Sequence, residues 1–376
     1  MPRSEVVLVL NAGSSSLKYQ VQRHPTGERL LGDHIERVDR DGWDTALREV
    51  VTAVDSAGLR AELTAVGHRV VHGGALHTEP VVIDDAVVAS IEDLARLAPL
   101  HNPPAVEGIR RALTAFPDLP QVAVFDTAFF SELPEVAATY AIDTEVAKAE
   151  CIRRFGMHGI SHEYVAGRAA EVLGRPVREL DQITLHLGNG ASAAAVRGGR
   201  AVETSMGLTP LEGLVMGTRG GDLDPGVLLH LLRHGGYDVE GLDDLLHRRS
   251  GLRGLAGTND FRDLGTAIDA GDERSRLAHE VYCHRIRKYV GAYLAVLGGA
   301  DTVVFTGGVG ENAARVRADA LSRLDVLGIE VDQERNRAVG EDPAVISTTS
   351  SRVAVLVVPT DEELAIARQV AELISR

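Results

Sequence analysis

The chain has 376 residues, of which 44% are hydrophobic and 25% are charged. This balance is typical of a globular protein, and the length is sufficient for two domains with separate cores. The formal net charge of −15 argues against nucleic acid or an anionic membrane surface as the main partner, although it does not exclude small anionic ligands.

The two cysteines, Cys151 and Cys283, give neither a disulfide framework nor a metal-ligand spacing. We therefore expect a reduced, cytoplasmic environment. No apolar run approaches the roughly 18 residues that a membrane-spanning helix needs. The short apolar stretch near the N-terminus leads into a strand pattern rather than a signal-peptide cleavage site, so we expect no membrane association.

Strand-like and helix-like segments alternate in the first half of the chain. A strand is predicted within residues 62–74, and a helix with apolar residues at helical spacing over 84–98. Residues 121–130 predict a buried strand with Asp126 near its carboxyl end. Alternation of this kind predicts an α/β architecture.

One local pattern occurs twice. Residues 6–22 predict two strands joined by a turn of glycine and serines, with Lys18 just after the turn. Residues 182–205 repeat the plan, with Asn-Gly-Ala-Ser in place of Asn-Ala-Gly-Ser. Two unrelated glycine hairpins would explain the pattern, and so would a duplicated domain in which each copy offers a phosphate loop.

The second half continues with a long helix over 279–299, a strand over 301–308 and a helix over 309–321. A strand over 352–360 and an amphipathic helix over 362–376 close the chain. We expect a domain boundary soon after Asp126, with the last helix returning to the first domain. The predicted domains are residues 1–127 plus 362–376, and residues 128–361.

Three segments have the composition of phosphate-binding turns, in which backbone N–H groups and cations meet the anion. They are residues 11–18, with Lys18, residues 186–190 and the glycine-rich residues 307–312. Each also has an ordinary explanation as a tight turn or as close helix packing. Neither a P-loop signature nor a properly spaced G-x-G-x-x-G fingerprint occurs, which argues against a P-loop or dinucleotide fold.

Several charged residues lie where predicted strands or helices begin or end. Arg69 and Arg219 stand beside glycines, and a planar guanidinium suits carboxylate or phosphate. Asp126 and Glu362 are candidates for magnesium, which takes one or two carboxylates together with waters. The alternatives are surface arginines, a favourable helix-dipole partner for Glu362 and a structural role for His158.

The motifs taken together resemble the acetate kinase family, in the same order and from Asn11 to Arg368. The matching segments are NAGSSSLKY, GHRVVHGG, APLHNPP, VFDTAFF, RRFGMHGISH, HLGNGAS, TSMGLTPLEGLVMGTRGGDLDPG, SGLRGL, TNDFRDL, FTGGVGENA and PTDEELAIAR. The resemblance implies an α/β, duplicated two-domain actin-like ATPase (ribonuclease H-like) fold, with mixed sheets and a nucleotide cleft between the domains. It also implies reversible transfer of the ATP γ-phosphoryl group to acetate, and a homodimer.

The resemblance implies roles at the reacting centre. Arg69 would hold the acyl carboxylate, Arg219 the migrating phosphoryl group and His158 its equatorial oxygens. Asp126 occupies the catalytic acid position and helps to arrange the metal. The pocket for the methyl group would be lined by Val71, Leu100 and Pro210.

The same resemblance implies how ATP or ADP and the metal are held. Asn11 and Glu362 match the positions that bind Mg²⁺, with Mn²⁺ as an alternative. The residues matching nucleotide-binding positions are Lys18, His186, Leu187, Gly188, Asn189, Gly190, Asp260, Phe261, Arg262, Gly308, Val309, Gly310, Glu311 and Asn312.

The sequence departs from the family pattern in a few places. Met157 stands where an aromatic residue is usual, and the segment between Tyr19 and Arg69 is short. These departures leave open a kinase for propionate or another short-chain acid. A non-catalytic nucleotide switch on the same fold is the alternative of a different class, and the joint presence of Arg69, Asp126, His158 and Arg219 argues against it.

Overall fold

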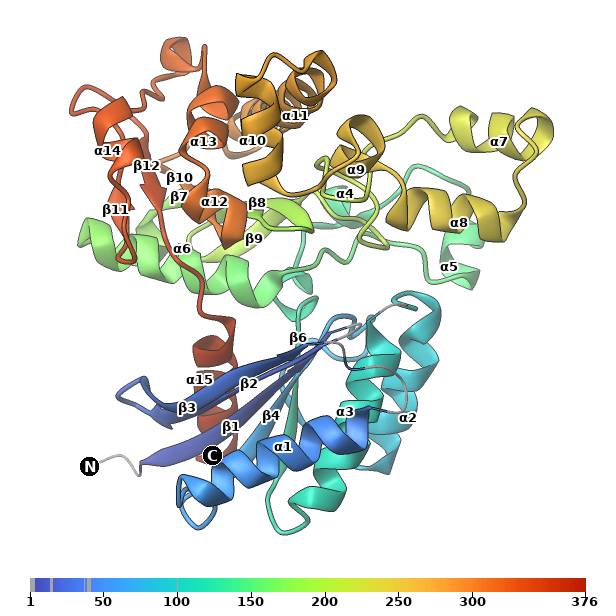
Figure 1. Cartoon of the computed structure of the whole chain (residues 1–376), viewed down its shortest axis with the longest axis vertical. Helices are drawn as coiled ribbons and strands as arrows, with labels where there is room; N and C mark the ends of the chain where they lie inside the picture. Colours follow the sequence, from blue (N-terminus) through green and yellow to red (C-terminus); the bar gives the residue numbers. More distant parts are fainter. Residues whose placement is uncertain (1–3, 14–15, 37, 39–41, 100) are drawn as a thin grey trace. The chain divides into compact units, whose positions relative to one another are not determined.

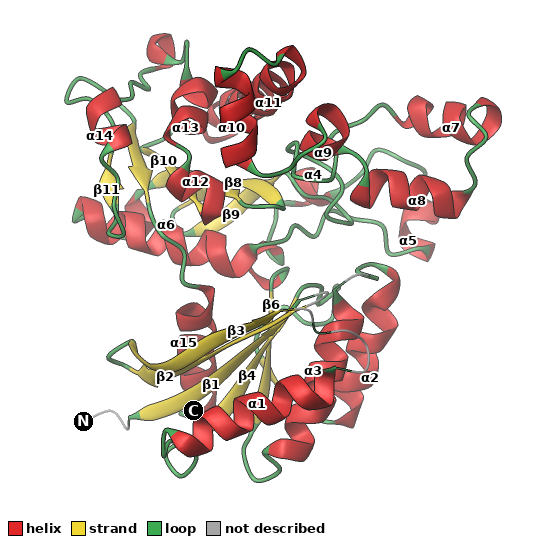
Figure 2. Cartoon of the chain, viewed as in Figure 1, coloured by secondary structure: helices red, strands yellow, loops and turns green. Residues whose placement is uncertain are grey.

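The computed structural model describes residues 4–13, 16–36, 38, 42–99 and 101–376. Its elements are drawn along the chain in Figure 1 and by type in Figure 2. The chain divides into two compact units. Unit 1 comprises Met1–Ser131, Met157–Ser161 and Asp361–Arg376, and unit 2 comprises Glu132–Gly156 and His162–Thr360.

Unit 1 is built on a six-stranded mixed sheet in the order β3-β2-β1-β4-β6-β5. The strands are β1 (Glu5–Ala12), β2 (Ser16–His24), β3 (Glu28–Glu36), β4 (Ala65–Val70), β5 (Val81–Val82) and β6 (Gln121–Phe125). Strands β3, β2 and β1 form an antiparallel meander, whereas β1, β4 and β6 are parallel. The carboxyl ends of the three parallel strands therefore lie at one edge of the sheet.

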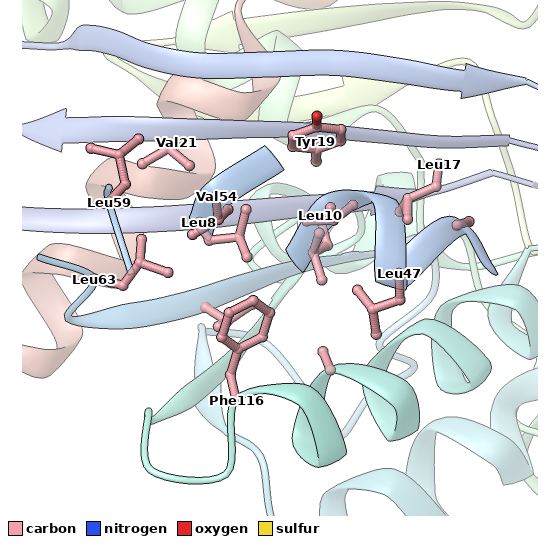
Figure 3. Close-up of a cluster of buried hydrophobic side chains, with 14 of the residues drawn as sticks. Leu8, Leu10, Leu17, Tyr19, Val21, Leu47, Val54, Leu59, Leu63 and Phe116 are labelled. Carbon is pink, nitrogen blue, oxygen red and sulfur yellow. The ribbon is translucent and has the colours of Figure 1, made fainter. Parts of the chain in front are cut away.

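Helices cover both faces of the unit 1 sheet. They are α1 (Trp43–Ser56), α2 (Asp85–Asp93), α3 (Asn102–Ala115) and α15 (Glu362–Ile374). Leu8 and Leu10 of β1 join a core formed with α1 and α3 (Figure 3). Gly67 of β4 lies against α15, which covers the opposite face. Burial on both faces explains why β1 reads as a continuous apolar run.

Unit 2 has a second six-stranded mixed sheet, in the order β11-β12-β10-β7-β8-β9. Its strands are β7 (Asp181–Leu187), β8 (Ala191–Arg197), β9 (Arg200–Thr204), β10 (Thr302–Thr306), β11 (Ala344–Val345) and β12 (Ala354–Val357). Here β7, β8 and β9 form the meander, and β7, β10 and β12 are parallel. Replacing each strand of unit 1 by its counterpart reproduces this order, so the two units share one topology. The repeated hairpin in the sequence corresponds to β1–β2 and β7–β8.

The helices of unit 2 are mostly short, apart from two that pack on its sheet. Val165 and Ala169 of α6 are buried against Val304 and Leu356, and α11 contacts β7 and β8. The helices are α4 (Glu135–Ala138), α5 (Thr144–Ala149), α6 (Gly159–Leu173), α7 (Pro225–His234), α8 (Val239–Arg248), α9 (Gly251–Ala256), α10 (Phe261–Asp269), α11 (Glu273–Leu297), α12 (Gly307–Asn312), α13 (Ala314–Leu321) and α14 (Gln333–Arg337). The first three residues of α6 belong to unit 1. Each unit also contains two short 3₁₀ turns. Those of unit 1 cover Leu94–Arg96 and Ala128–Phe130, and those of unit 2 cover Val177–Glu179 and Asp325–Leu327 in the described chain.

The predicted α/β fold with mixed sheets is confirmed, and three local predictions need correction. The strand predicted over 121–130 ends at Phe125, because the chain turns at Asp126 into a 3₁₀ turn. The helix predicted over 84–98 ends at Asp93. The glycine-rich residues 307–312 form the helix α12 themselves, and a break at Ala313 separates it from α13. Within the described residues, no helix has the length and apolar character needed to cross a membrane.

Candidate active site

In unit 1, Arg69 and Asp126 meet at the carboxyl edge of the sheet. Arg69 lies near the end of β4, and Asp126 directly follows the neighbouring parallel strand β6. Arg69 donates from Nε to Asp126 Oδ1 (3.2 Å) and from Nη2 to Asp126 Oδ2 (2.7 Å). The pair is a two-pronged guanidinium–carboxylate contact with a fully buried carboxylate.

Burial and charge oppose each other in this pair. Burial raises the pKa of Asp126 to about 6, against the opposing effect of Arg69. Burial on its own would lower the pKa of the Arg69 guanidinium, but Asp126 and Glu362 hold that pKa above its ordinary value. Arg69 is therefore a permanent cation that compensates a buried carboxylate.

Two further oxygens lie close to the third nitrogen of Arg69. Glu362 Oε2 is 3.3 Å from Arg69 Nη1, and Asn11 Oδ1 accepts a hydrogen bond from the same nitrogen at 3.4 Å. Carboxylate and amide oxygens are the ligands that Mg²⁺ prefers. The described residues contain no group of three or more His, Cys, Asp or Glu that could hold a metal ion.

Sequence reasoning missed Glu363, which holds two candidate residues in place. Lys18 Nζ lies 2.7 Å from Glu363 Oε2, and Asn11 Nδ2 donates to Glu363 Oε1 at 3.2 Å. The side chain of Glu363 is only 3% exposed. Asn11 and Lys18 are register partners across the β1–β2 hairpin, so their side chains reach the same carboxylate at the start of α15. The repeated acid in PTDEEL was the available signal.

His158 lies in a segment anchored on Asp126. Its backbone N–H donates to the Asp126 carboxylate, and Gly159 N–H donates to the Asp126 carbonyl at 2.9 Å. His158 has φ of 60°, a left-handed conformation that non-glycine residues seldom adopt. Residue 159 must be glycine, because a Cβ there would lie 2.1 Å from the Asp126 carbonyl oxygen.

The candidate acyl-pocket residues are only partly placed. Val71 directly follows β4 and is half-buried, beside Arg69 in sequence. Pro210 is buried in unit 2. Leu100 lies outside the described residues.

In unit 2, the turn 186–190 joins β7 to β8 and is tied to the segment that carries Arg219. Gly217 N–H donates to the carbonyl of Asn189 at 2.9 Å, and Asn259 Nδ2 donates to Asn189 Oδ1 at the same distance. A Cβ at residue 217 would lie 2.1 Å from Asn189 Oδ1, so glycine permits this close approach. The loop of residues 186–190 and the segment around Arg219 therefore form one local assembly.

Arg219 differs from Arg69 in its surroundings. Arg219 Nη1 donates to the Pro210 carbonyl at 3.0 Å, and no carboxylate of the described chain forms an ion pair with it. Burial lowers the pKa of its guanidinium, the expected response of a cation without a nearby anion. This arrangement can receive an anionic group.

Six of the residues that match nucleotide-binding positions line one cavity of about 730 Å³ in unit 2. The assigned residues in its wall are Asp260, Phe261, Arg262, Gly308, Val309 and Asn312. Sequence reasoning missed the rest of the wall, Asn259, Leu264, Gly265, Ile268, His279, Ala313, Ala314, Arg315 and Val316. The volume is within the usual range for small-molecule sites.

Gly310 and Glu311 do not line this cavity. Glu311 Oε1 accepts hydrogen bonds from the backbone N–H groups of Gly307 (2.9 Å) and Thr360 (3.2 Å). Gly310 is a buried residue of α12 itself. Glu311 therefore holds the start of α12 in place, and neither residue contributes to the cavity wall.

The sequence matches the acetokinase family over residues 33–368. An acetate kinase from Streptomyces avermitilis is 52% identical over 393 aligned residues, covering 98% of this chain and 97% of the relative. An acetate kinase from Clavibacter michiganensis subsp. michiganensis is 53% identical over 387 residues, covering 97% and 98%.

Two solved structures match nearly the whole chain. The crystal structure of Porphyromonas gingivalis acetate kinase has a TM-score of 0.91 at 40% identity, covering 98% of this chain and 100% of that one. A propionate kinase from Francisella tularensis has a TM-score of 0.89 at 37% identity, covering 97% and 98%. The resemblance drawn from the motifs is thus confirmed, and the chain is a kinase that belongs to the acetokinase family.

Proposed function

We propose that this kinase transfers the γ-phosphoryl group of ATP reversibly to acetate, giving acetyl phosphate and ADP. The observation that carries the proposal is Arg219, a half-buried cation without a carboxylate partner in the described chain, next to the glycine-containing loop 186–190. Such a cation is suited to the charge of a migrating phosphoryl group. We take acetate as the phosphoryl acceptor because the relatives described above are named acetate kinases.

The proposed reaction needs little base catalysis from the protein. A carboxylate is already a nucleophile at neutral pH, so the enzyme must align the reactants and neutralise charge spread over the phosphoryl oxygens. We assign Arg219 and His158 to those oxygens and Arg69 to the acyl carboxylate. Asp126 orients Arg69 through the two-pronged contact.

Asn11 and Glu362 are the residues that would hold Mg²⁺, because their oxygens lie near one point, the Nη1 atom of Arg69. When bound, Mg²⁺ supplies charge neutralisation to the nucleotide phosphates. Lys18 and loop 186–190 bind the phosphates, and the 730 Å³ cavity takes the adenosine.

Propionate is the second candidate substrate. One structural relative is a propionate kinase, and the buried Met157, 1% exposed, stands where the resemblance implies an aromatic residue. An unbranched thioether adapts more readily than a ring to one extra methylene.

We also propose that the enzyme is a homodimer. Helix α7 has no buried residue, and its apolar Val227, Leu229 and Leu232 are 43%, 48% and 38% exposed. Exposed apolar surface of this kind marks protein interfaces. Sedimentation equilibrium tests this proposal, and a monomer at micromolar concentration would reject it.

The test of the activity is a hydroxylamine-trapping assay with ATP, Mg²⁺ and acetate, propionate or butyrate. We expect most hydroxamate from acetate and less from propionate, since a methylene changes binding by about 1–3 kcal/mol. Absence of product with every acid would reject the proposed function. A higher kcat/KM for propionate than for acetate would establish the second candidate.

A further inference from the structure

A second cavity of about 580 Å³ adjoins the adenosine cavity of unit 2. We call it the annex. The two cavities share Ile268, His279 and Arg315 in their walls. The proposed function assigns no role to the annex.

The annex is rich in positive charge, although the chain as a whole carries −15. Its wall contains four arginines and two carboxylates. The arginines are Arg276, Arg287, Arg315 and Arg323. Positive residues gathered in a concave surface of an acidic protein indicate an anion site.

The two carboxylates of the annex are already paired. Asp319 Oδ2 lies 2.7 Å from His279 Nε2, and Glu280 Oε1 accepts from Arg276 Nη1 at 3.5 Å. Arg315 is paired with Asp269, which is not part of the annex wall. This leaves Arg287 and Arg323 as the cations without a carboxylate partner in the described chain.

Both of these arginines have donors to spare. Arg287 Nη2 donates to Ser322 Oγ at 2.7 Å and to the Asp319 carbonyl, and within the described residues no hydrogen bond or ion pair uses its Nη1. Arg323 is exposed, and it forms no hydrogen bond or ion pair with the rest of the described chain. It has φ of 67°, a left-handed conformation that non-glycine residues seldom adopt and that is often found at functional sites.

We propose that the annex binds the phosphate group of a small metabolite, with Arg287 and Arg323 as its ligands. Their unused N–H groups match the acceptor oxygens of a phosphate. The phosphate is either inorganic phosphate or a second phosphate on an adenine nucleotide whose base occupies the adjoining cavity. Because His279 and Arg315 belong to both walls, occupancy of the annex changes nucleotide affinity.

Isothermal titration calorimetry without acetate tests the proposal, using two probes. One is inorganic phosphate, and the other is adenosine 3′,5′-bisphosphate compared with AMP. Arg323→Gln should weaken the binding of one probe about tenfold, the value of one charge-assisted hydrogen bond. Arg323→Lys should recover part of the loss. Arg337→Gln removes another exposed arginine of unit 2, outside the annex, and should change binding less than twofold.

The probe that responds to Arg323→Gln identifies the source of the phosphate. Unchanged dissociation constants for both probes, in a variant with a normal thermal melt, would overturn the proposal. Acetate-dependent turnover is measured separately without phosphate and should be retained in Arg323→Gln. The binding and turnover measurements together distinguish an error in the annex proposal from an error in the proposed kinase function.

Discussion

At the scale of single residues, the two arginines differ in what their removal leaves behind. Removal of Arg69 leaves the buried Asp126 carboxylate without its cation, whereas removal of Arg219 leaves no carboxylate of the described chain unpaired. We expect Arg219→Ala to lower kcat about 100- to 1000-fold, as for loss of one donor to a developing oxyanion. Acetate KM should change only a few-fold, since the contact is made chiefly in the transition state.

The matched measurement is thermal unfolding of the same variants. Arg219→Ala should melt no lower than the wild type, whereas Arg69→Ala should be destabilised because it leaves a buried charge uncompensated. Arg219→Lys should restore only part of kcat, because an ammonium lacks the planar fork. A well-folded Arg219→Ala enzyme with near-native kcat would remove Arg219 from the reacting centre.

Glu363 acts through the residues that it holds. Glu363→Ala removes the acceptors of both Asn11 Nδ2 and Lys18 Nζ. The Mg²⁺ concentration for half-maximal activity should rise about tenfold or more, as for loss of a group that orients a metal ligand. Glu363→Gln should recover part of the loss because it keeps an acceptor oxygen. Glu372→Ala, an exposed position on the same helix, is the control and should leave the Mg²⁺ requirement unchanged.

His68 makes unit 1 sensitive to acid. It is buried against Gln121 (Nε2 to Oε1, 2.7 Å), and burial lowers its pKa from 6.5 to about 4. Between these two values the unfolded chain binds a proton that the folded chain does not, so stability falls as pH decreases from 6.5 toward 4. The difference between the two pKa values corresponds to about 3 kcal/mol.

Urea unfolding at pH 7, 6 and 5 measures this effect. The single tryptophan, Trp43, is buried in unit 1 and reports on that unit. His68→Gln should show a weaker loss of stability on acidification, and His34→Gln, at an exposed position, should behave like the wild type. Equal pH dependence in all three proteins would contradict the assignment to His68.

At the scale of elements, the position of Glu362 and Glu363 depends on how closely α15 approaches the sheet. Gly67 of β4 permits that approach, because a Cβ there would lie 2.8 Å from Val370 and 3.0 Å from Ile366. Gly67→Ala should therefore displace α15 and destabilise unit 1 by about 1–3 kcal/mol, the usual cost of overpacking. The Mg²⁺ requirement should rise in the same variant, since α15 begins at Glu362.

Gly291→Ala is the control for the added methyl group. A Cβ at residue 291 meets no atom within 4 Å, and alanine favours the interior of α11. This variant should be as stable as the wild type or slightly more stable. Normal stability and a normal Mg²⁺ requirement in Gly67→Ala would contradict the prediction, because they would show that the added methyl group does not displace α15.

Local sequence patterns predicted the helices and strands well, but they could not predict the contacts between segments that lie far apart in the chain. The hairpin 6–22 and its echo at 182–205 were readable because alternation and turn residues are local signals. The same patterns could not show that Glu363 reaches Lys18, 345 residues away in the chain. The wall residues Asn259 and His279 were missed for the same reason, since only the packing of α10, α11 and α13 places them on one cavity.

At the scale of the whole molecule, the duplication divides the residues that we assign to the nucleotide between the units. Loop 11–18 belongs to unit 1, whereas loop 186–190 and the cavity proposed for adenosine belong to unit 2. If one ATP molecule is held by both loops, as the proposed function requires, binding must bring them to the same phosphates. We therefore expect nucleotide and acyl substrate to favour a closed arrangement.

Closure has a chemical reason as well as a geometric one. Water differs little from a carboxylate as a phosphoryl acceptor, so the reacting centre must exclude water during transfer. Small-angle X-ray scattering should show a smaller radius of gyration with ADP, acetate and a planar phosphoryl mimic than without ligands. Acetate alone should leave the curve unchanged, because it engages residues assigned mainly to unit 1. Identical curves with and without the complete ligand set would refute closure, and ATP hydrolysis in the absence of acetate would then be expected to compete with transfer.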